Sequence, residues 1–218
     1  MSVLVETLHA AEFIVSEATD ARGRSQGILA AGNDLDTGTV LGRLTKNTVA
    51  VAKISGTGVA TFGAVTLGPN ALPGVYLLTC TAAVNGGTPA VFSVTAPNGF
   101  ALPDLSAAST YTSSHINAVA ATIPAGTTAW APGDKIGITV SGTGAYTKLN
   151  LTAVNGAADA AAILFSPVDA SEGALPCVVT DSDTIVKGAL LTWPTGISPA
   201  QKAAAIQQLA ARGIKLAA

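Results

Sequence analysis

The sequence predicts a mainly β fold with a C-terminal helix, in which a β-sandwich-like domain is inserted into a host domain. Three observations lead to this prediction: a change of charge along the chain, turn residues at short intervals, and a capped helical segment near the end. Only 11% of the 218 residues are charged, against about 25% in an ordinary soluble domain. Because 49% are hydrophobic, the composition excludes disorder and allows one large or two small packed domains.

The charge pattern marks the insert. Asp104 is the single charged residue between Ile54 and Gly133, whereas charges are frequent before Lys46 and after Lys148. The boundary predicts an inserted all-β domain at 47–146 and a host formed by 1–46 and 147–218. A hairpin tip on the surface is where a chain tolerates such an insertion.

Turn residues divide the insert into short β-type runs. The turns contain Gly, Pro and Asn, as in Pro73-Gly74 and Pro97-Asn98-Gly99. The runs between the turns are Thr48–Ile54, Phe62–Leu67, Val75–Ala82, Ala90–Thr95, Ile116–Ile123 and Ile136–Val140. Strands that recur about every 8–12 residues are typical of an all-β sandwich or barrel.

The host pieces contain apolar runs that predict strands. They are Glu12–Ser16, Gln26–Ala31, Thr39–Leu44, Ala160–Phe165, Cys177–Thr180 and Ile185–Val186. Together with the insert, they make the chain β-rich over almost its whole length.

The final element is a predicted helix with complete end signals. Ser198 is the expected N-cap, Pro199 stands at the first helical position, and Gln201 completes a capping box. Gly213 is expected to end the helix in a left-handed conformation, with Ile214 against Leu209. The predicted apolar stripe consists of Ala203, Ile206, Leu209 and Ala210.

Residues that could support catalysis or metal binding are few. His9 and His115 lie in different domains, and Gly56-Thr57-Gly58 lacks the third glycine of a dinucleotide-binding loop. Asn33–Asp36 and Asp181–Asp183 lack the spacing of a calcium loop, so we interpret both as acidic turns. We therefore expect no enzyme activity, no catalytic residue, no metal and no cofactor.

Charge and hydropathy limit the possible partners. The net charge is −2 without any basic run, so the chain offers little to nucleic acid. The most apolar stretch, Val75–Val84, is half the length of a membrane-spanning helix, and the first residues do not resemble a secretory signal. Cys80 and Cys177 are expected to be buried free thiols, although a disulfide between them is possible.

Three stretches of the host carry a family resemblance. They are EFIVSEA (12–18) with the link RGRS (22–25), TGTVLGRL (37–44), and the region from Ala160 onward, with AAAILFSPVDAS, CVVTDSDTIV and LTWPTGISPAQKAAAIQQLAARGIKL. These stretches resemble the lambda-type head decoration protein family of bacteriophages. The step Trp193-Pro194-x-Gly196-Ile197 before the helix is the most specific feature. The insert departs from the short members of that family and looks like the Ig-like β-modules of phage structural proteins.

The resemblance implies a β-clip-type fold and a capsid decoration, or cement, function. It implies homotrimers bound to the major capsid protein at three-fold and quasi-three-fold positions on the outer surface of the expanded head. There they would stabilise the virion against the pressure of packed DNA, after synthesis in the host cytoplasm. The structural residues that we single out are Trp193, Pro194 and Gly196 from this resemblance, together with Ser198 and Gly213 from the helix ends.

The same resemblance implies an N-terminal arm that docks on the capsid. Glu12, Phe13, Ile14, Val15 and Ser16 are the candidate capsid-binding residues, since a short β-prone segment can add as a strand to an exposed sheet edge. Phe13 and Val15 would then fill alternate pockets, and three arms on one trimer would bind more durably than one. The alternative is that this segment is the first strand of the host's own sheet.

A second functional hypothesis assigns the insert to adhesion. A displayed β-domain could bind a host-surface glycan or protein through its aromatic residues, although most of these are expected in its core. The candidates are Tyr76, Phe92, Tyr111 and Trp130. Trp193-Pro194 could likewise be a ligand platform, but we favour a tryptophan packed under the helix start.

Overall fold

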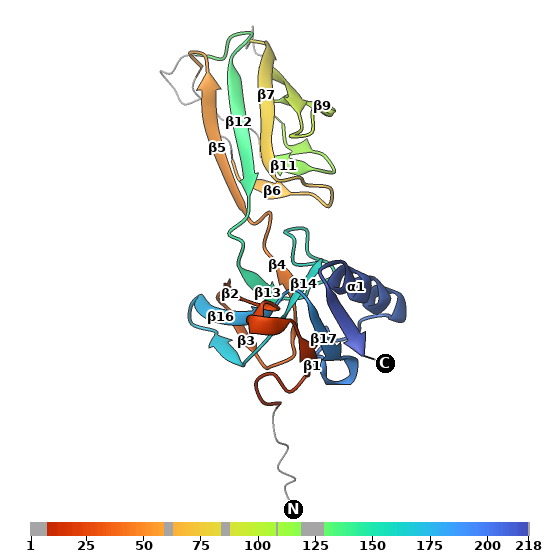
Figure 1. Cartoon of the computed structure of the whole chain (residues 1–218). Coiled ribbons are helices and arrows are strands. Elements are labelled where there is room, and N and C mark those ends of the chain that lie inside the picture. Colours follow the sequence, from red (N-terminus) through yellow and green to blue (C-terminus); the bar gives the residue numbers. More distant parts are fainter. Residues whose placement is uncertain (1–7, 59–62, 84–87, 108, 119–128, 218) are drawn as a thin grey trace, which may run out of the picture. The chain divides into compact units, whose positions relative to one another are not determined.

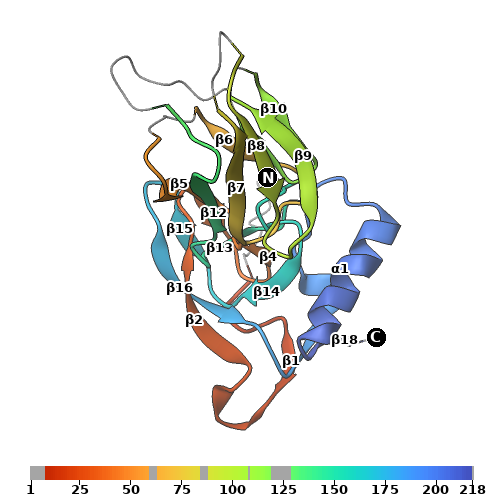
Figure 2. The same cartoon turned by 90° about the horizontal axis from the view of Figure 1, so that it is seen from above.

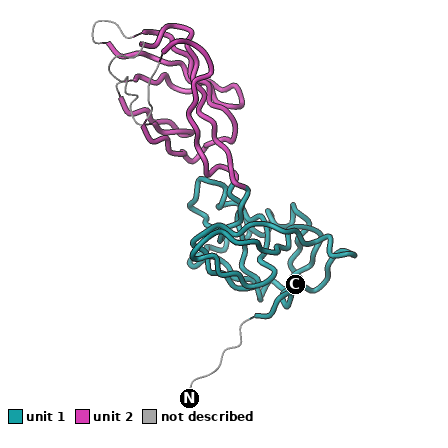
Figure 3. Tube along the Cα trace, turned by 90° about the vertical axis from the view of Figure 1, so that its left-hand side faces the viewer, with its two compact units in different colours: residues 1–44, 144–218 teal, residues 45–143 magenta. Residues whose placement is uncertain are grey.

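The computed structural model describes residues 8–58, 63–83, 88–107, 109–118 and 129–217 (Figure 1). The chain folds into two compact units, and both are mainly β. Unit 1 contains 1–44 and 144–218, and unit 2 contains 45–143 (Figure 3).

The division lies slightly N-terminal to both expected boundaries, which were 46/47 and 146/147. Tyr146 belongs to unit 1 because it pairs with Arg43 and its ring lies in a unit 1 core. Lys46 belongs to unit 2, where its Nζ donates a hydrogen bond to the Ala71 carbonyl at 3.0 Å.

Unit 1 is built around a closed five-stranded barrel. In order around the barrel the strands are β13 (Tyr146–Lys148), β2 (Arg24–Leu29), β16 (Leu175–Thr180), β14 (Ala160–Leu164) and β4 (Val40–Arg43). Every residue of β14 is buried, as expected of a strand that packs on both faces. The short strands β3 (Asn33–Leu35) and β15 (Val168–Ala170) pair beside the barrel.

A second sheet of unit 1 joins the two ends of the host. Its order is β1 (Ile14–Glu17), β17 (Thr184–Lys187) and β18 (Ile214–Ala217). Helix α1 (Pro199–Ala211) packs against β14 and β18 (Figures 1 and 2). Two short 3-10 turns, η1 (Thr19–Ala21) and η2 (Gly188–Leu190), complete the unit.

Unit 2 contains two antiparallel sheets that share one apolar core. The larger sheet has the order β5 (Thr48–Ser55), β12 (Lys135–Ser141), β7 (Gly74–Ala82), β8 (Val91–Thr95) and β9 (Ala101–Ser106). The smaller sheet has the order β10 (Tyr111–Thr112), β11 (Ile116–Ala118) and β6 (Val65–Leu67). Tyr76, Phe92 and Ile138 from the first sheet and Ile116 from the second are fully buried together.

Most expected strands are confirmed, and their described ends lie within three residues of those expected. Phe62 and residues 119–123, which we included in two of them, lie outside the described residues. Six strands were missed: β3, β9, β10, β13, β15 and β18; of these, β3 covers Asn33–Leu35, where we expected an acidic turn. Strand β9 contains Pro103, which suits a sheet edge but weakens a strand prediction.

The helix ends are confirmed, but the predicted stripe is partly wrong. Ala205 and Leu209 are its buried residues, whereas Ala203 and Ala210 are exposed. The packed side includes a polar residue, because the side chain of Gln208 accepts the Ala160 N–H at 2.7 Å. Alanine has too small an apolar surface to reveal which side of a helix is packed.

Candidate functional site

The expected capsid-binding segment forms an edge strand of unit 1. Strand β1 pairs antiparallel with β17, with Ile14 opposite Val186 and Glu17 opposite Thr184. Phe13 is fully buried in a core cluster with Val186 and Leu209. The expectation of a free arm is therefore wrong for these residues, and the alternative of a strand in the host's own sheet is what the structure shows.

Several interactions hold β1 in place. The Lys187 N–H donates to the Phe13 carbonyl at 2.7 Å, and the Ala18 N–H donates to the Asp183 carbonyl at 3.1 Å. Glu17 forms an ion pair with Arg24, whose guanidinium lies 4.2 Å from the centre of the Phe165 ring. A segment with a buried phenylalanine and a partly buried ion pair does not leave its sheet without a large cost.

Three of the five candidate residues remain accessible. Glu12, Val15 and Ser16 are exposed, and Val15 retains 52% of its surface at a register shift in the β1–β17 pairing. Among the described residues, β17 is the only strand that pairs with β1, so the other edge of β1 is open. Strand β1 can therefore accept a partner strand while Phe13 stays in the core.

The residues before the helix take the structural roles expected of them. Trp193 is half-buried against the cluster that contains Leu209, and the Lys202 Nζ lies 5.2 Å from its ring centre. The Gln201 N–H donates to the Ser198 Oγ at 3.2 Å, and the Ser198 N–H donates to the Gln201 Oε1 at 2.9 Å. The capping box is thus complete, and the helix start is fixed to the core by the tryptophan.

Two glycines in this region have left-handed backbones. Gly196 has φ of +76° in the turn between Pro194 and the N-cap. Gly213 has φ of +87°, and a Cβ there would lie 2.9 Å from the Asp183 backbone nitrogen. Gly213 therefore permits both the helix end and the close approach that starts β18.

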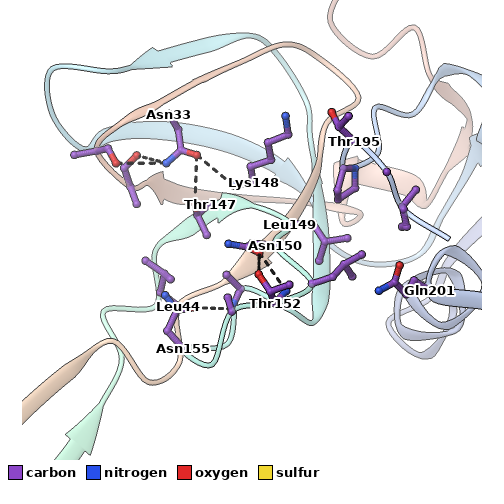
Figure 4. Close-up of a pocket in the computed structure, with 18 residues that line it drawn as sticks. Asn33, Leu44, Thr147, Lys148, Leu149, Asn150, Thr152, Asn155, Thr195 and Gln201 are labelled. Atoms are coloured by element: carbon purple, nitrogen blue, oxygen red, sulfur yellow. Dashed lines mark hydrogen bonds between the residues drawn. The ribbon is translucent and has the colours of Figure 1, made fainter. Parts of the chain in front are cut away.

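The same Pro194–Ile197 step forms one wall of a groove of about 710 Å³ on unit 1 (Figure 4). The opposite walls come from the start of β3, from β13 and from the loop that follows it. The labelled lining residues are Asn33, Leu44, Thr147, Lys148, Leu149, Asn150, Thr152, Asn155, Thr195 and Gln201. Sequence reasoning missed this groove because four separate segments form it, around 30–33, 44, 147–157 and 194–201. The asparagine-containing loop 150–155 was the available signal.

Most of the side-chain amides that line the groove already form hydrogen bonds with other residues of the groove. The Asn33 Oδ1 accepts hydrogen bonds from the Thr147 hydroxyl and the Lys148 N–H, at 3.2 and 3.3 Å. The Asn150 Oδ1 accepts the Thr152 N–H and hydroxyl, at 3.2 and 2.9 Å. The groove thus presents a rigid, mixed apolar and amide surface, which suits contact with a polypeptide better than acid–base chemistry.

The other candidate groups for chemistry are dispersed. His9 lies beside Glu12 in unit 1, whereas the His115 ring is 6.4 Å from the Tyr76 ring in unit 2. In the described part of the chain, no three His, Cys, Asp or Glu residues are grouped as metal ligands would be. No helix in that part is long and apolar enough to cross a membrane.

The aromatic candidates of unit 2 belong to its core. Tyr76, Phe92, Tyr111 and Trp130 are all at most 5% exposed, and the Phe92 and Trp130 rings meet edge to face at 5.5 Å. They cannot form a displayed aromatic platform while unit 2 is folded. The aromatic residues on which the adhesion hypothesis depended are therefore not available to bind a ligand.

The Gly56-Thr57-Gly58 turn wraps around a buried carboxylate. Asp134 is 6% exposed, and its Oδ2 accepts the N–H groups of Gly58 at 2.9 Å and Ala131 at 3.1 Å. These backbone donors, first Ala131 and then Gly58, lower the pKa of Asp134. A Cβ at Gly56 would lie 2.0 Å from the Asp134 Oδ1, so the turn needs glycine there.

The two cysteines are buried free thiols in different units. Burial raises the pKa of Cys177, and burial together with the Asp134 charge raises that of Cys80. Because the thiolate is the reactive form, neither cysteine has the character of a nucleophile.

Comparison with known proteins identifies the family. The family described as "Bacteriophage lambda head decoration protein D" matches residues 3–214. No curated protein matches the chain. The crystal structure of Xanthomonas campestris FlgL is 14% identical over 79% of this chain and 43% of its own length. Its TM-score of 0.31 is too low to relate the folds. The chain therefore belongs to the bacteriophage lambda head decoration protein D family, and its role is the decoration of a phage capsid.

Proposed function

We propose that the protein is a non-enzymatic cement protein that binds as a homotrimer to the outer surface of the expanded head. It occupies three-fold and quasi-three-fold positions and stabilises the shell against DNA pressure. The observation that carries the proposal is the family match over residues 3–214. The arrangement of the site supports it, since an open strand edge and a groove with satisfied amides suit protein contacts.

In this proposal, β1 contacts the major capsid protein as an edge strand rather than as a released arm. The exposed side chains of Glu12, Val15 and Ser16 face the partner, while Phe13 and Ile14 hold the strand in unit 1. Backbone hydrogen bonds along the open edge supply affinity. Three such edges on one trimer raise the effective affinity without further contacts.

The groove beside Pro194–Ile197 is the surface that we assign to contacts between protomers. It is lined by the step that distinguishes the family in sequence, and Ile197 supplies half-buried apolar surface there. Ile197→Glu should place a charge in this surface and weaken the trimer, whereas Val15→Glu should not.

Two measurements test the proposal. Light scattering should give about 64 kDa, three times the chain mass of 21.4 kDa; a persistent monomer at micromolar concentration would contradict the trimer. The protein should also co-sediment with closed, expanded heads to which it is added from outside. Val15→Glu should reduce this binding at least about tenfold, because a loss of about 1.4 kcal/mol of binding free energy weakens the affinity tenfold.

The matched control is Val75→Glu, since Val75 is 46% exposed on unit 2. Its binding to heads should equal that of the unchanged protein. Equal binding by Val15→Glu and Val75→Glu would refute the assignment of β1, and the absence of any binding to expanded heads would refute the decoration proposal. Protection of DNA-filled heads against heat tests the stabilising role.

A further inference from the structure

The barrel of unit 1 has a second hollow, of about 500 Å³, to which the proposed function gives no role. It lies over β2 and β16, and its lining includes Gln26, Ile28, Ser166, Val168, Pro176 and Val178. Pro176 is directly opposite Ile28 in the pairing of the two strands, and the neighbouring Leu29 is buried inside the barrel. Ile28 is 46% exposed, so this β2–β16 hollow presents apolar surface on the outside of the barrel.

A cyclic trimer requires two different contact surfaces on each protomer. Every contact in a three-fold ring is heterologous, so each protomer shows one surface to one neighbour and another surface to the other. The proposed function assigns the groove beside Pro194–Ile197 to one of these surfaces and leaves the other open.

The exposed apolar side chains of unit 1 indicate where the second surface lies. In the part of the chain that the structure describes, the large ones are Val15, Ile28, Leu175 and Ile185. Val15 and Ile185 belong to the sheet of β1 and β17, which the proposed function assigns to the capsid. Leu175 begins β16 beside the hollow. The β2–β16 hollow is therefore the apolar surface that remains for a neighbouring protomer.

The groove and the hollow lie on adjoining sides of the barrel. Strand β13 lines the groove, β16 lines the hollow, and β2 pairs with both of these strands (Figure 1). A protomer in a three-fold ring is a wedge whose two contact faces meet beside the axis. Two surfaces on either side of β2 satisfy this requirement.

The charges beside the two surfaces are complementary. Asp169 directly follows Val168 of the hollow and is opposite Asp34 across the β3–β15 pairing. Glu172 is exposed in the next turn, and among the described residues none of these three carboxylates forms a salt bridge. Directly opposed like charges destabilise a sheet, so a cation from a partner would be favourable here. Lys148 is exposed in the wall of the groove and can supply that cation.

We propose that the Pro194–Ile197 step of one protomer packs into the β2–β16 hollow of the next. The step is a turn in which the Ile197 N–H donates to the Pro194 carbonyl at 3.3 Å, with Thr195 and Gly196 exposed at its tip. A turn that is already closed loses little conformational freedom when it is bound. The inference rests on the proposed trimer and names the surface that the groove of each protomer meets.

Complementation between two variants of the full chain tests this contact. Ile28→Glu places a charge in the hollow and leaves the step unchanged, whereas Ile197→Glu does the reverse. Each variant alone should be monomeric, because every contact in its ring would contain one altered surface. In an equimolar mixture, the step of the first variant still fits the hollow of the second. Sedimentation should then show a complex of about 43 kDa, two chains of 21.4 kDa, that associates at least about tenfold more tightly than either variant alone.

The matched control is Ile185→Glu, since Ile185 is 39% exposed in the same unit but lies on β17. It should remain a trimer, and Ile28→Glu should keep the melting temperature of the unchanged protein because Ile28 is exposed. A monomeric unchanged protein would refute the proposed trimer itself. A trimer that survives Ile28→Glu, or a mixture that associates no more tightly than its components, would overturn this contact and leave the proposed function standing.

Reversal of two charges provides an independent measurement. Glu172→Lys should weaken the trimer by about fivefold, as expected for an exposed ion pair replaced by like charges. Adding Lys148→Glu to the same chain should restore the trimer, because the pair is then present with its signs exchanged. A double variant that is weaker than Glu172→Lys alone would contradict the pairing of these surfaces.

Discussion

Phe13 offers a direct test of whether β1 belongs to the folded unit. Its side chain is fully buried with Val40, Ile163 and Leu209. Replacing a core phenylalanine with alanine costs about 3–5 kcal/mol, because apolar contacts are lost and a cavity remains. A domain of this size is stable by about 5–15 kcal/mol, so Phe13→Ala should remove a large part of the stability of unit 1.

Urea unfolding measures this loss in unit 1 alone. The chain has two tryptophans, Trp130 in unit 2 and Trp193 in unit 1, so Trp130→Phe leaves a reporter for unit 1. With a urea dependence of about 2 kcal/mol per molar, Phe13→Ala should lower the midpoint by about 2 M.

Val15→Ala is the matched control within the same strand. Val15 is 52% exposed, so its truncation should change the stability by less than about 0.5 kcal/mol. A loss below about 1 kcal/mol for Phe13→Ala would refute the reasoning and would restore the free-arm interpretation of residues 12–16. The same logic predicts that deletion of residues 1–17 unfolds unit 1, because it removes Phe13 and the whole of β1.

Two further variants test the helix start and the buried carboxylate. Ser198→Ala should destabilise unit 1 by about 1 kcal/mol in the same urea assay, and Ser198→Asp should not, because aspartate is an equally good N-cap. Asp134 has a pKa below its value in the unfolded chain, so its stabilising effect is present at neutral pH and is lost as the pH falls through the folded-state pKa. Asp134→Asn should therefore lower the melting temperature of unit 2 at pH 7 and flatten its decline in acid; an unchanged acid dependence would refute this role.

The sequence predicted the elements that local chemistry specifies. The capping residues Ser198 and Gln201 and the left-handed Gly213 act within one or two turns of chain, and the structure has them as expected. The strands between closely spaced turn residues were found for the same reason. Alternation and turn chemistry are local signals, so they locate elements without saying what those elements pair with.

The strand with which β1 pairs could not be predicted in this way. The run EFIVS has the same local pattern whether it binds another protein or pairs with β17, which lies about 170 residues away. The groove has the same difficulty, since Asn33, Lys148 and Ile197 become neighbours only after the barrel has closed. Long-range pairing and the burial that follows from it are tertiary properties.

The insertion point itself shows how the two units can be separated. The Leu44 N–H donates to the Ala145 carbonyl at 2.8 Å, and the Gly144 N–H donates to the Leu44 carbonyl at 2.9 Å. The two chain ends that leave unit 1 are therefore already paired, as they are at the end of a hairpin. Gly144 has φ of +74°, the left-handed conformation that a two-residue hairpin turn requires.

Replacing 45–143 with a single asparagine would join Leu44 to Gly144 through an Asn-Gly turn. We expect the shortened chain to fold, because the core clusters of unit 1 draw only on residues outside 45–143. It should retain the trimer and binding to expanded heads. Circular dichroism, light scattering and co-sedimentation would measure these three properties. Failure to fold would show that unit 1 needs unit 2 as a scaffold; normal folding with lost head binding would instead place unit 2 in the capsid contact.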